Sequence, residues 1–186
     1  DLDIHHGNGT EDIVRRYTNP SRLLFFSLHL YDKDITPGYE FFPGSGAQDD
    51  SAHNIINVPI LPMWHNQTEG SSGTEPPRSS RSSSGNHTDT TSPTASQSTT
   101  NSNNKSPGGS HIGPLTGREA YRQAIIQRLL PALRAFNPAL ILLSTGFDPA
   151  MGDVGNSKTS GTNEVGMDLA PSDFEWVTSE VMKIAD

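Results

Sequence analysis

The sequence predicts an α/β fold in which a parallel sheet is flanked by helices. Nearly continuous apolar runs occur at 23–28 and 139–144, and stretches with helical periodicity alternate with them. Strands covered on both faces have such uninterrupted apolar runs, and parallel strands need long, usually helical connections. The 186 residues are enough for one domain, or for two.

The individual elements follow from local patterns. The expected strands are residues 1–5 (the end of a strand), 23–28, 55–61 and 139–144. The expected helices are 11–17, 117–136 and 171–185. An Asn-Pro pair follows each of the first two helices and ends it. Ser172 is the expected N-cap of the last helix, with Glu175 as its capping-box partner.

Residues 65–117 differ from the rest of the chain. They contain 22 Ser or Thr residues and no Phe, Trp or Tyr. Such a segment cannot bury enough apolar surface to offset the entropy lost on ordering. We therefore expect a low-complexity, disordered insert at 65–117 that separates two parts of one domain, 1–64 and 118–186.

Charge and composition exclude several function classes. Within the insert, three acidic residues balance three basic ones, so the net charge of −8 comes from the rest of the chain. This acidity argues against direct nucleic-acid binding and is compatible with a basic peptide substrate. The absence of cysteine excludes a disulfide framework and thiolate chemistry. No stretch approaches the roughly 20 apolar residues of a membrane span.

The first ten residues read Asp-Leu-Asp-Ile-His-His-Gly-Asn-Gly-Thr and resemble half of a metal site. In an extended chain, alternate side chains share one face. Asp1, Asp3 and His5 therefore lie on one face, and His6 lies on the other and is expected to be structural. The glycine-rich run after His6 lets the backbone turn beside an ion.

Asp148 is the candidate for a third protein ligand. It follows the apolar run at 139–144, so in a parallel sheet it lies at the same edge as Asp3 and His5. Two carboxylates and one imidazole balance a divalent cation and leave a coordination position open. The expected chemistry is metal-assisted hydrolysis of an amide. Zinc fits this ligand set, and so do Fe(II), Mn(II) and Co(II).

Several motifs together resemble the catalytic domain of zinc-dependent histone deacetylases, nearer the class II (Hda1-like) branch. They are Asp1–Thr10, Phe26-Ser27-Leu28-His29, Phe41-Phe42-Pro43-Gly44, Phe136-Asn137-Pro138 and residues 144–153. This resemblance implies the arginase/deacetylase fold and zinc ligation by Asp3, His5 and Asp148. It implies hydrolysis of acetyl-lysine; the alternatives are an acetylpolyamine amidohydrolase and a non-catalytic scaffold.

The resemblance also implies roles that spacing cannot supply. Asp1 matches the carboxylate that orients a catalytic histidine, and Phe42 matches an aromatic wall of the acetyl-lysine tunnel. Asn8 matches the residue type of class II-like members. The implied structural potassium site consists of Asp1, Ser27 and the carbonyl groups of Asp3, His5 and Leu28.

The family also needs an adjacent histidine pair upstream of the metal motif and a downstream Tyr or His, and neither is in this sequence. We therefore expect a partial catalytic domain, poorly stable and with little activity by itself. The implied partners are acetylated histone tails or other acetyl-lysine proteins and a corepressor complex, without direct nucleic-acid or membrane binding. The implied location is the nucleus, the cytoplasm or both.

Overall fold

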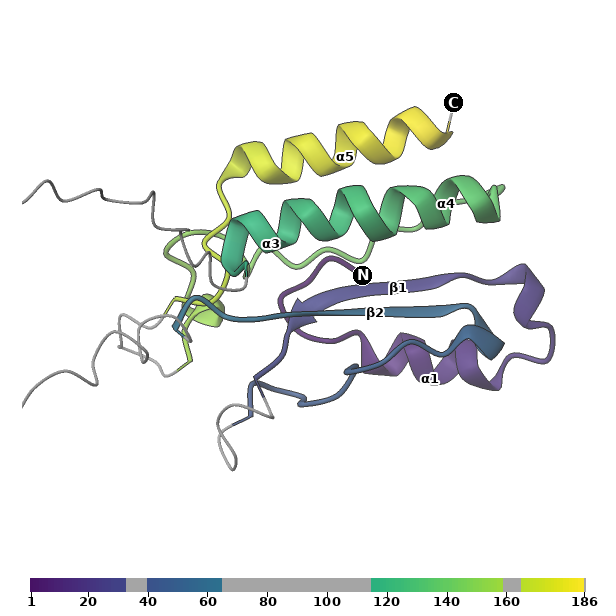
Figure 1. Cartoon of the computed structure of the whole chain (residues 1–186), viewed down its shortest axis with the longest axis horizontal. Coiled ribbons are helices and arrows are strands. Elements are labelled where there is room, and N and C mark those ends of the chain that lie inside the picture. Colours follow the sequence, from purple (N-terminus) through teal and green to yellow (C-terminus); the bar gives the residue numbers. More distant parts are fainter. Residues whose placement is uncertain (33–39, 65–114, 159–164, 186) are drawn as a thin grey trace, which may run out of the picture.

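A computed structural model describes residues 1–32, 40–64, 115–158 and 165–185 (Figure 1). Most of the predicted insert therefore lies outside the described residues. Of its last three residues, Leu115 packs against the core and Gly117 begins a helix.

The sheet is parallel, as predicted. Strands β1 (Phe25–Leu30) and β2 (Ile55–Ile60) pair in register from Phe25 opposite Ile55 to Leu30 opposite Ile60. All six residues of β1 are buried, which explains its uninterrupted apolar run. β1 begins and ends two residues later than the predicted strand at 23–28.

Two irregular segments extend the sheet beyond β1. Residues 1–4 lie beside this strand, because the Leu28 N–H donates to the Asp1 carbonyl at 3.1 Å and the Leu30 N–H donates to the Ile4 carbonyl at 2.9 Å. On their other side, the Leu2 N–H donates to the Ser144 carbonyl at 2.9 Å. Residues 1–4 are therefore held between β1 and the end of the 139–144 segment.

The prediction of a buried strand at 139–144 is wrong for this structure. No regular strand forms there, and Leu140 and Leu142 are 73% and 81% exposed. Among the described residues, the Ser144 carbonyl makes the one backbone hydrogen bond between this segment and a neighbouring segment. Ile141 packs against the core, but no element of the described part of the chain covers Leu140 and Leu142. An apolar run favours burial, but burial requires surfaces on both sides.

Helix α1 (Asn8–Arg16) begins before the predicted start at residue 11. The Glu11 N–H donates to the Gly7 carbonyl at 3.0 Å, so the turn after the metal motif leads directly into the helix. The helix ends at Arg16, ahead of the Asn-Pro pair that predicted its end.

The helix predicted at 117–136 is confirmed as one continuous rod. It consists of α3 (Gly117–Ala124), a π-helical turn (Ile125–Leu129) and α4 (Leu130–Phe136). Pro131 lacks an N–H and its ring crowds the preceding turn, which favours a local widening of the helix. The chain leaves the rod at Asn137, which has a left-handed conformation with φ of 53°.

The last helix, α5 (Pro171–Ala185), matches the predicted range, but its N-terminal cap differs. Because the helix begins at Pro171, Ser172 lies inside it. The Asp173 carboxylate reaches back and accepts a hydrogen bond from the Ala170 N–H at 2.9 Å. Asp173 thus has the role that the capping-box prediction gave to Glu175.

The strands lie between helices on both faces (Figure 1). The α3–α4 rod packs against β2 and α5 packs on α4, while α1 covers the opposite face of the strands. The core between the rod and the sheet is built from large, fully buried side chains, including Ile4, Leu28, Tyr121, Ile125 and Met167. Within the described part of the chain, no helix has the length and apolarity that a membrane crossing requires.

Candidate metal centre

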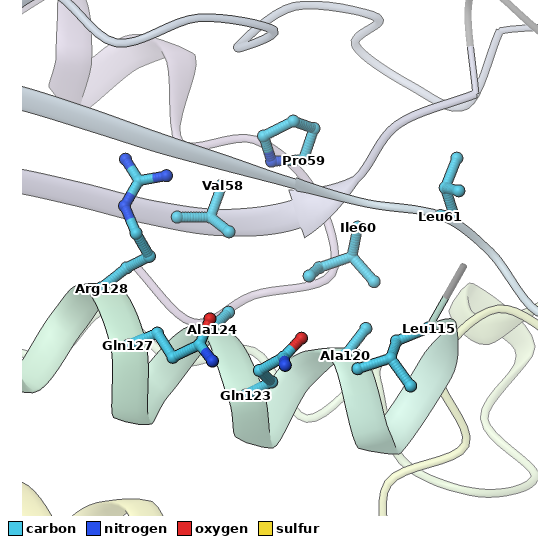
Figure 2. A pocket seen from close by; sticks show the side chains of 10 residues that line it. All are labelled: Val58, Pro59, Ile60, Leu61, Leu115, Ala120, Gln123, Ala124, Gln127 and Arg128. Carbon is cyan, nitrogen blue, oxygen red and sulfur yellow. The ribbon is translucent and has the colours of Figure 1, made fainter. Parts of the chain in front are cut away.

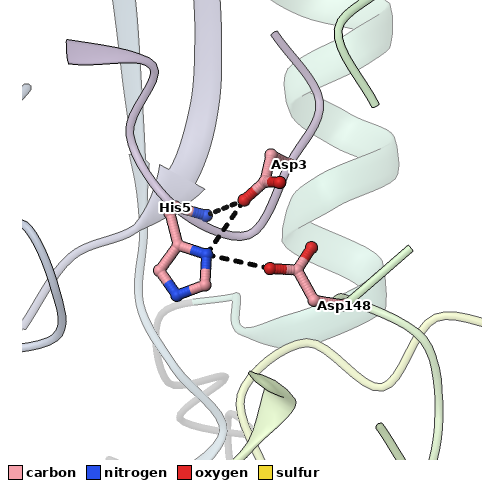
Figure 3. Close-up of side chains that lie close together, drawn as sticks. All are labelled: Asp3, His5 and Asp148. Atoms are coloured by element: carbon pink, nitrogen blue, oxygen red, sulfur yellow. Dashed lines mark hydrogen bonds and ion pairs between the residues drawn. The ribbon is translucent and has the colours of Figure 1, made fainter. Parts of the chain in front are cut away.

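The structure brings Asp3, His5 and Asp148 together (Figure 3). One ligand atom from each residue lies within 4.8 Å of the others. The His5 Nδ1 atom is 3.0 Å from the Asp3 Oδ1 atom and 2.8 Å from the Asp148 Oδ2 atom. Residues 143 positions apart in sequence therefore share one site.

The alternation of the first six residues explains how these side chains are presented. Leu2 and Ile4 are 2% and 0% exposed and anchor the segment in the core. The side chains of Asp3 and His5 remain 30% and 35% exposed on the other face. Apolar anchoring thus orients the polar groups, although the segment bends at residues 3–5 and is not a regular strand.

Backbone hydrogen bonds fix one oxygen of each carboxylate. The His5 N–H donates to Asp3 Oδ1 at 2.7 Å, and the Ile4 N–H donates to Asp148 Oδ1 at 3.4 Å. Each aspartate therefore has a restrained rotamer before any ion binds, which lowers the entropy lost on binding.

Gly146 makes the close approach of the two aspartates feasible. A Cβ atom at this position would collide with the Asp3 carboxylate and lie 2.7 Å from Asp148 Oδ1. Any larger residue would displace the carboxylates, so glycine is required here by space rather than by backbone conformation.

The site concentrates negative charge. Desolvation by burial, followed by the neighbouring charge of Asp3, raises the pKa of the Asp148 carboxyl above its usual range. A divalent cation between these groups would relieve this repulsion. Two carboxylates and an imidazole on rigidly held segments fit zinc and the related divalent ions, so the donor set matches the implied cofactor.

Gly7 lies beside both side chains of the implied potassium site. The Gly7 N–H donates to Ser27 Oγ at 3.3 Å, and a Cβ on Gly7 would collide with the Asp1 carboxylate. The Asp1 Oδ1 atom accepts a hydrogen bond from the Asp3 N–H at 3.1 Å. The remaining implied ligands are carbonyl groups of Asp3, His5 and Leu28 in the adjoining segments.

His6 faces away from the metal centre, as its position predicts, and is 5% exposed. Its Nδ1 atom lies 2.8 Å from Ser45 Oγ, and its Nε2 atom lies 2.8 Å from Glu11 and 3.1 Å from Asn57. These contacts tie the metal-binding segment to α1, β2 and the loop after residue 40. The sequence suggested a structural role for His6 but did not identify its partners.

An aromatic neighbour of the site was missed in the sequence. Phe41 stacks on the His5 imidazole with a centroid distance of 5.0 Å and an interplanar angle of 12°. The predicted tunnel residue Phe42 lies edge-on to His5 at 6.2 Å and is 73% exposed. Because the two phenylalanines are adjacent, the sequence does not indicate which of the two rings stacks on the histidine.

A separate groove of about 360 Å³ lies between β2 and α3 (Figure 2). None of the three metal-site side chains lines it. Its walls are Val58, Pro59, Ile60, Leu61, Leu115, Ala120, Gln123, Ala124, Gln127 and Arg128. The groove is therefore not part of the candidate metal centre.

The whole chain, residues 1–186, matches the family model described as the histone deacetylase domain. The chain therefore belongs to the histone deacetylase family, whose members are metal-dependent amidohydrolases. This match confirms the resemblance seen in the sequence motifs and the expected fold class.

Individual relatives agree with this assignment. The chain is 27% identical to human "Histone deacetylase 9", across 100% of this chain and 13% of that protein. It is 30% identical to the "Histone deacetylase-like amidohydrolase" of Pseudomonas aeruginosa, across 80% of this chain and 24% of that protein. Human "Histone deacetylase 7" is 29% identical, and these human relatives place the likeness in class II.

A solved structure has the same fold. The HD domain of HDA15 aligns with a TM-score of 0.56 at 20% identity, covering 100% of this chain and 35% of that one. This chain spans less than two fifths of the length of each relative cited here.

Proposed function

We propose that this chain forms part of a zinc-dependent protein lysine deacetylase in which Asp3, His5 and Asp148 hold the ion. The observation that supports this most directly is the convergence of their ligand atoms within 4.8 Å. A zinc ion bound there supplies Lewis acidity toward a carbonyl oxygen and lowers the pKa of a water molecule. Hydrolysis of acetyl-lysine requires both effects.

The protein groups restrain the ligands before the reaction. The backbone N–H groups of Ile4 and His5 each hold one carboxylate oxygen, and the Phe41 ring packs on the imidazole. Such support limits the reorganisation that a reacting site would otherwise need. The proposed role of Asp1 is to orient a histidine and, together with Ser27, to hold a structural potassium ion.

The two phenylalanines support an acyl-lysine substrate. Phe42 presents an exposed ring beside His5, and the aliphatic stem of an acetylated lysine is apolar and uncharged. Ring faces of this kind bury an alkyl chain while the amide reaches the metal. We therefore assign Phe42 to substrate binding, with acetylated histone tails or other acetyl-lysine proteins of the nucleus or cytoplasm as substrates and a corepressor complex as partner.

The test uses the full native protein that contains this chain, loaded with zinc. We expect one zinc ion at this centre and hydrolysis of an acetyl-lysine histone peptide. His5→Ala should abolish both, whereas His53→Ala should abolish neither, because His53 contacts Asp50 outside the site. Failure of the wild-type protein to bind zinc would contradict the proposal and favour a non-catalytic scaffold.

The sequence resemblance leaves an acetylpolyamine as the alternative substrate class. The same centre would hydrolyse an acetylpolyamine. A panel containing an acetyl-lysine peptide and an acetylpolyamine separates the two, because the preferred substrate has the larger kcat/KM.

A further inference from the structure

Asp32 is a buried acidic residue outside the proposed ligand set. It lies two residues after the end of β1 and is 1% exposed. Its Oδ1 atom accepts a hydrogen bond from the Phe41 N–H at 2.7 Å. Its Oδ2 atom is buried and has no hydrogen-bond partner among the described residues. A carboxylate in this position needs a cation nearby to compensate for its lost hydration.

Lys158 provides that cation from a distant part of the chain. Its Nζ atom lies 3.9 Å from Asp32 Oδ2, and its side chain is 18% exposed. The same ammonium group lies 5.9 Å from the centroid of the Trp64 ring. Lys158 follows a segment whose Gly155 lies beside Asp148, so this lysine belongs to the same part of the chain as one proposed ligand.

Phe41 connects this ion pair to the metal centre. Its backbone is held by Asp32, its ring stacks on His5 at 5.0 Å, and the same ring packs against the Trp64 ring at 5.9 Å. Lys158 thus contacts both Asp32 and Trp64. Each of these two residues also contacts Phe41, so the four residues form a closed set of contacts. Among the contacts of these four residues in the described part of the chain, the stacking of Phe41 on His5 is the one that involves a proposed metal ligand.

We propose that the buried ion pair of Asp32 and Lys158 is a positioning device that holds the Phe41 ring against the His5 imidazole. This inference deepens the proposed function, because it fixes the orientation of one metal ligand and one wall of the site. Asp32 and Lys158 are positioning residues that act through Phe41 and do not touch the reacting groups.

The experiment compares the ring-proton NMR shifts of His5 in the metal-free full native protein. A stacked phenyl ring displaces these resonances, and His5→Ala identifies them. Asp32→Ala should move both resonances toward values for an unstacked imidazole. Asp32→Asn should move them less, because its amide oxygen still accepts the Phe41 N–H. Lys158→Met should also move the His5 resonances, whereas Lys158→Arg, which keeps the positive charge, should leave them at their wild-type positions.

A second readout uses Co²⁺ as the probe. Loss of a group that supports a metal ligand weakens binding by about 10–100-fold, so Asp32→Ala, which acts one step further away, should weaken Co²⁺ binding by about tenfold. Lys183→Met is the matched control, because this exposed lysine pairs with Glu180 far along α5 and should change neither readout.

Unchanged His5 resonances in Asp32→Ala and Lys158→Met would overturn the inference, even if the melting temperature fell, because a merely structural pair would show that result. Failure of the wild-type protein to bind Co²⁺ would instead contradict the proposed metal site. The NMR comparison would still decide the positioning role, so the two failures are distinguishable.

Discussion

Gly146 lies at the narrowest point of the candidate metal centre, between the two aspartates. A methyl group there would collide with Asp3 and crowd Asp148. The constraint is local, because the atoms nearest to this position belong to those two carboxylates.

Gly146→Ala should therefore weaken zinc binding by about tenfold or more while leaving the fold intact. Competition with a chromophoric chelator measures the affinity. Gly9→Ala is the matched control, since a Cβ atom at Gly9 meets nothing within 4 Å. Equal zinc affinities for the two variants would show that the carboxylates do not converge as described.

At the scale of elements, Asp173 joins the start of α5 to α3. Its side chain is fully buried, and it pairs with Arg118 and Arg122 at 2.6 Å each. It also accepts the Ala170 N–H at the helix start. One carboxylate thus caps a helix and links it to its neighbour.

Asp173→Asn should destabilise the fold by about 2–4 kcal/mol, because it leaves two arginines without their buried partner. Chemical denaturation measures this loss. Glu180→Gln is the control: it removes an exposed ion pair with Lys183 and should cost less than about 1 kcal/mol. Similar losses in both variants would contradict the proposed importance of burial.

The same residue predicts a pH dependence. Burial raises the pKa of Asp173, but the hydrogen bonds from Arg118, the Ala170 N–H and Arg122 outweigh it, so the pKa lies below the usual range of an aspartate carboxyl. The unfolded chain therefore binds the proton more readily, and this contribution to stability is lost as pH falls through and below about 4. The measurement is the denaturation midpoint between about pH 6 and about pH 3, the range in which carboxyl groups titrate. This midpoint should fall less steeply with pH in Asp173→Asn than in the wild type.

At the scale of the whole molecule, the 140–154 stretch presents large apolar side chains to solvent. They are Leu140, Leu142, Leu143, Phe147, Met151 and Val154, exposed by 43% to 82%. Exposure of many large apolar side chains in one stretch promotes association.

We expect residues 1–186 to self-associate and to bind a hydrophobic dye. Leu140→Gln combined with Leu142→Gln should reduce both effects and change stability by less than about 1 kcal/mol, because these side chains are 73% and 81% exposed. Light scattering and dye fluorescence report the outcome. A large loss of stability would show that these leucines are buried in solution.

From the sequence alone it was possible to predict the fold class, the α3–α4 rod, α5 and the three candidate ligands. These predictions rest on patterns that act locally: the apolar period of a helix, the alternation of an extended segment, and the chemistry of Asp and His side chains. The alternation around Leu2 and Ile4 was sufficient to place Asp3 and His5 on the accessible face.

Other features could not be predicted, because they depend on contacts between segments that are distant in sequence. Residues 139–144 have the composition of a buried strand, but the described structure leaves their leucines exposed because no element covers them. The stacking of Phe41 rather than Phe42 on His5, the space at Gly146, and the meeting of Asp32 with Lys158 likewise depend on three-dimensional distances. A local pattern determines the type and the orientation of a side chain. The packing of distant segments determines which residues it contacts.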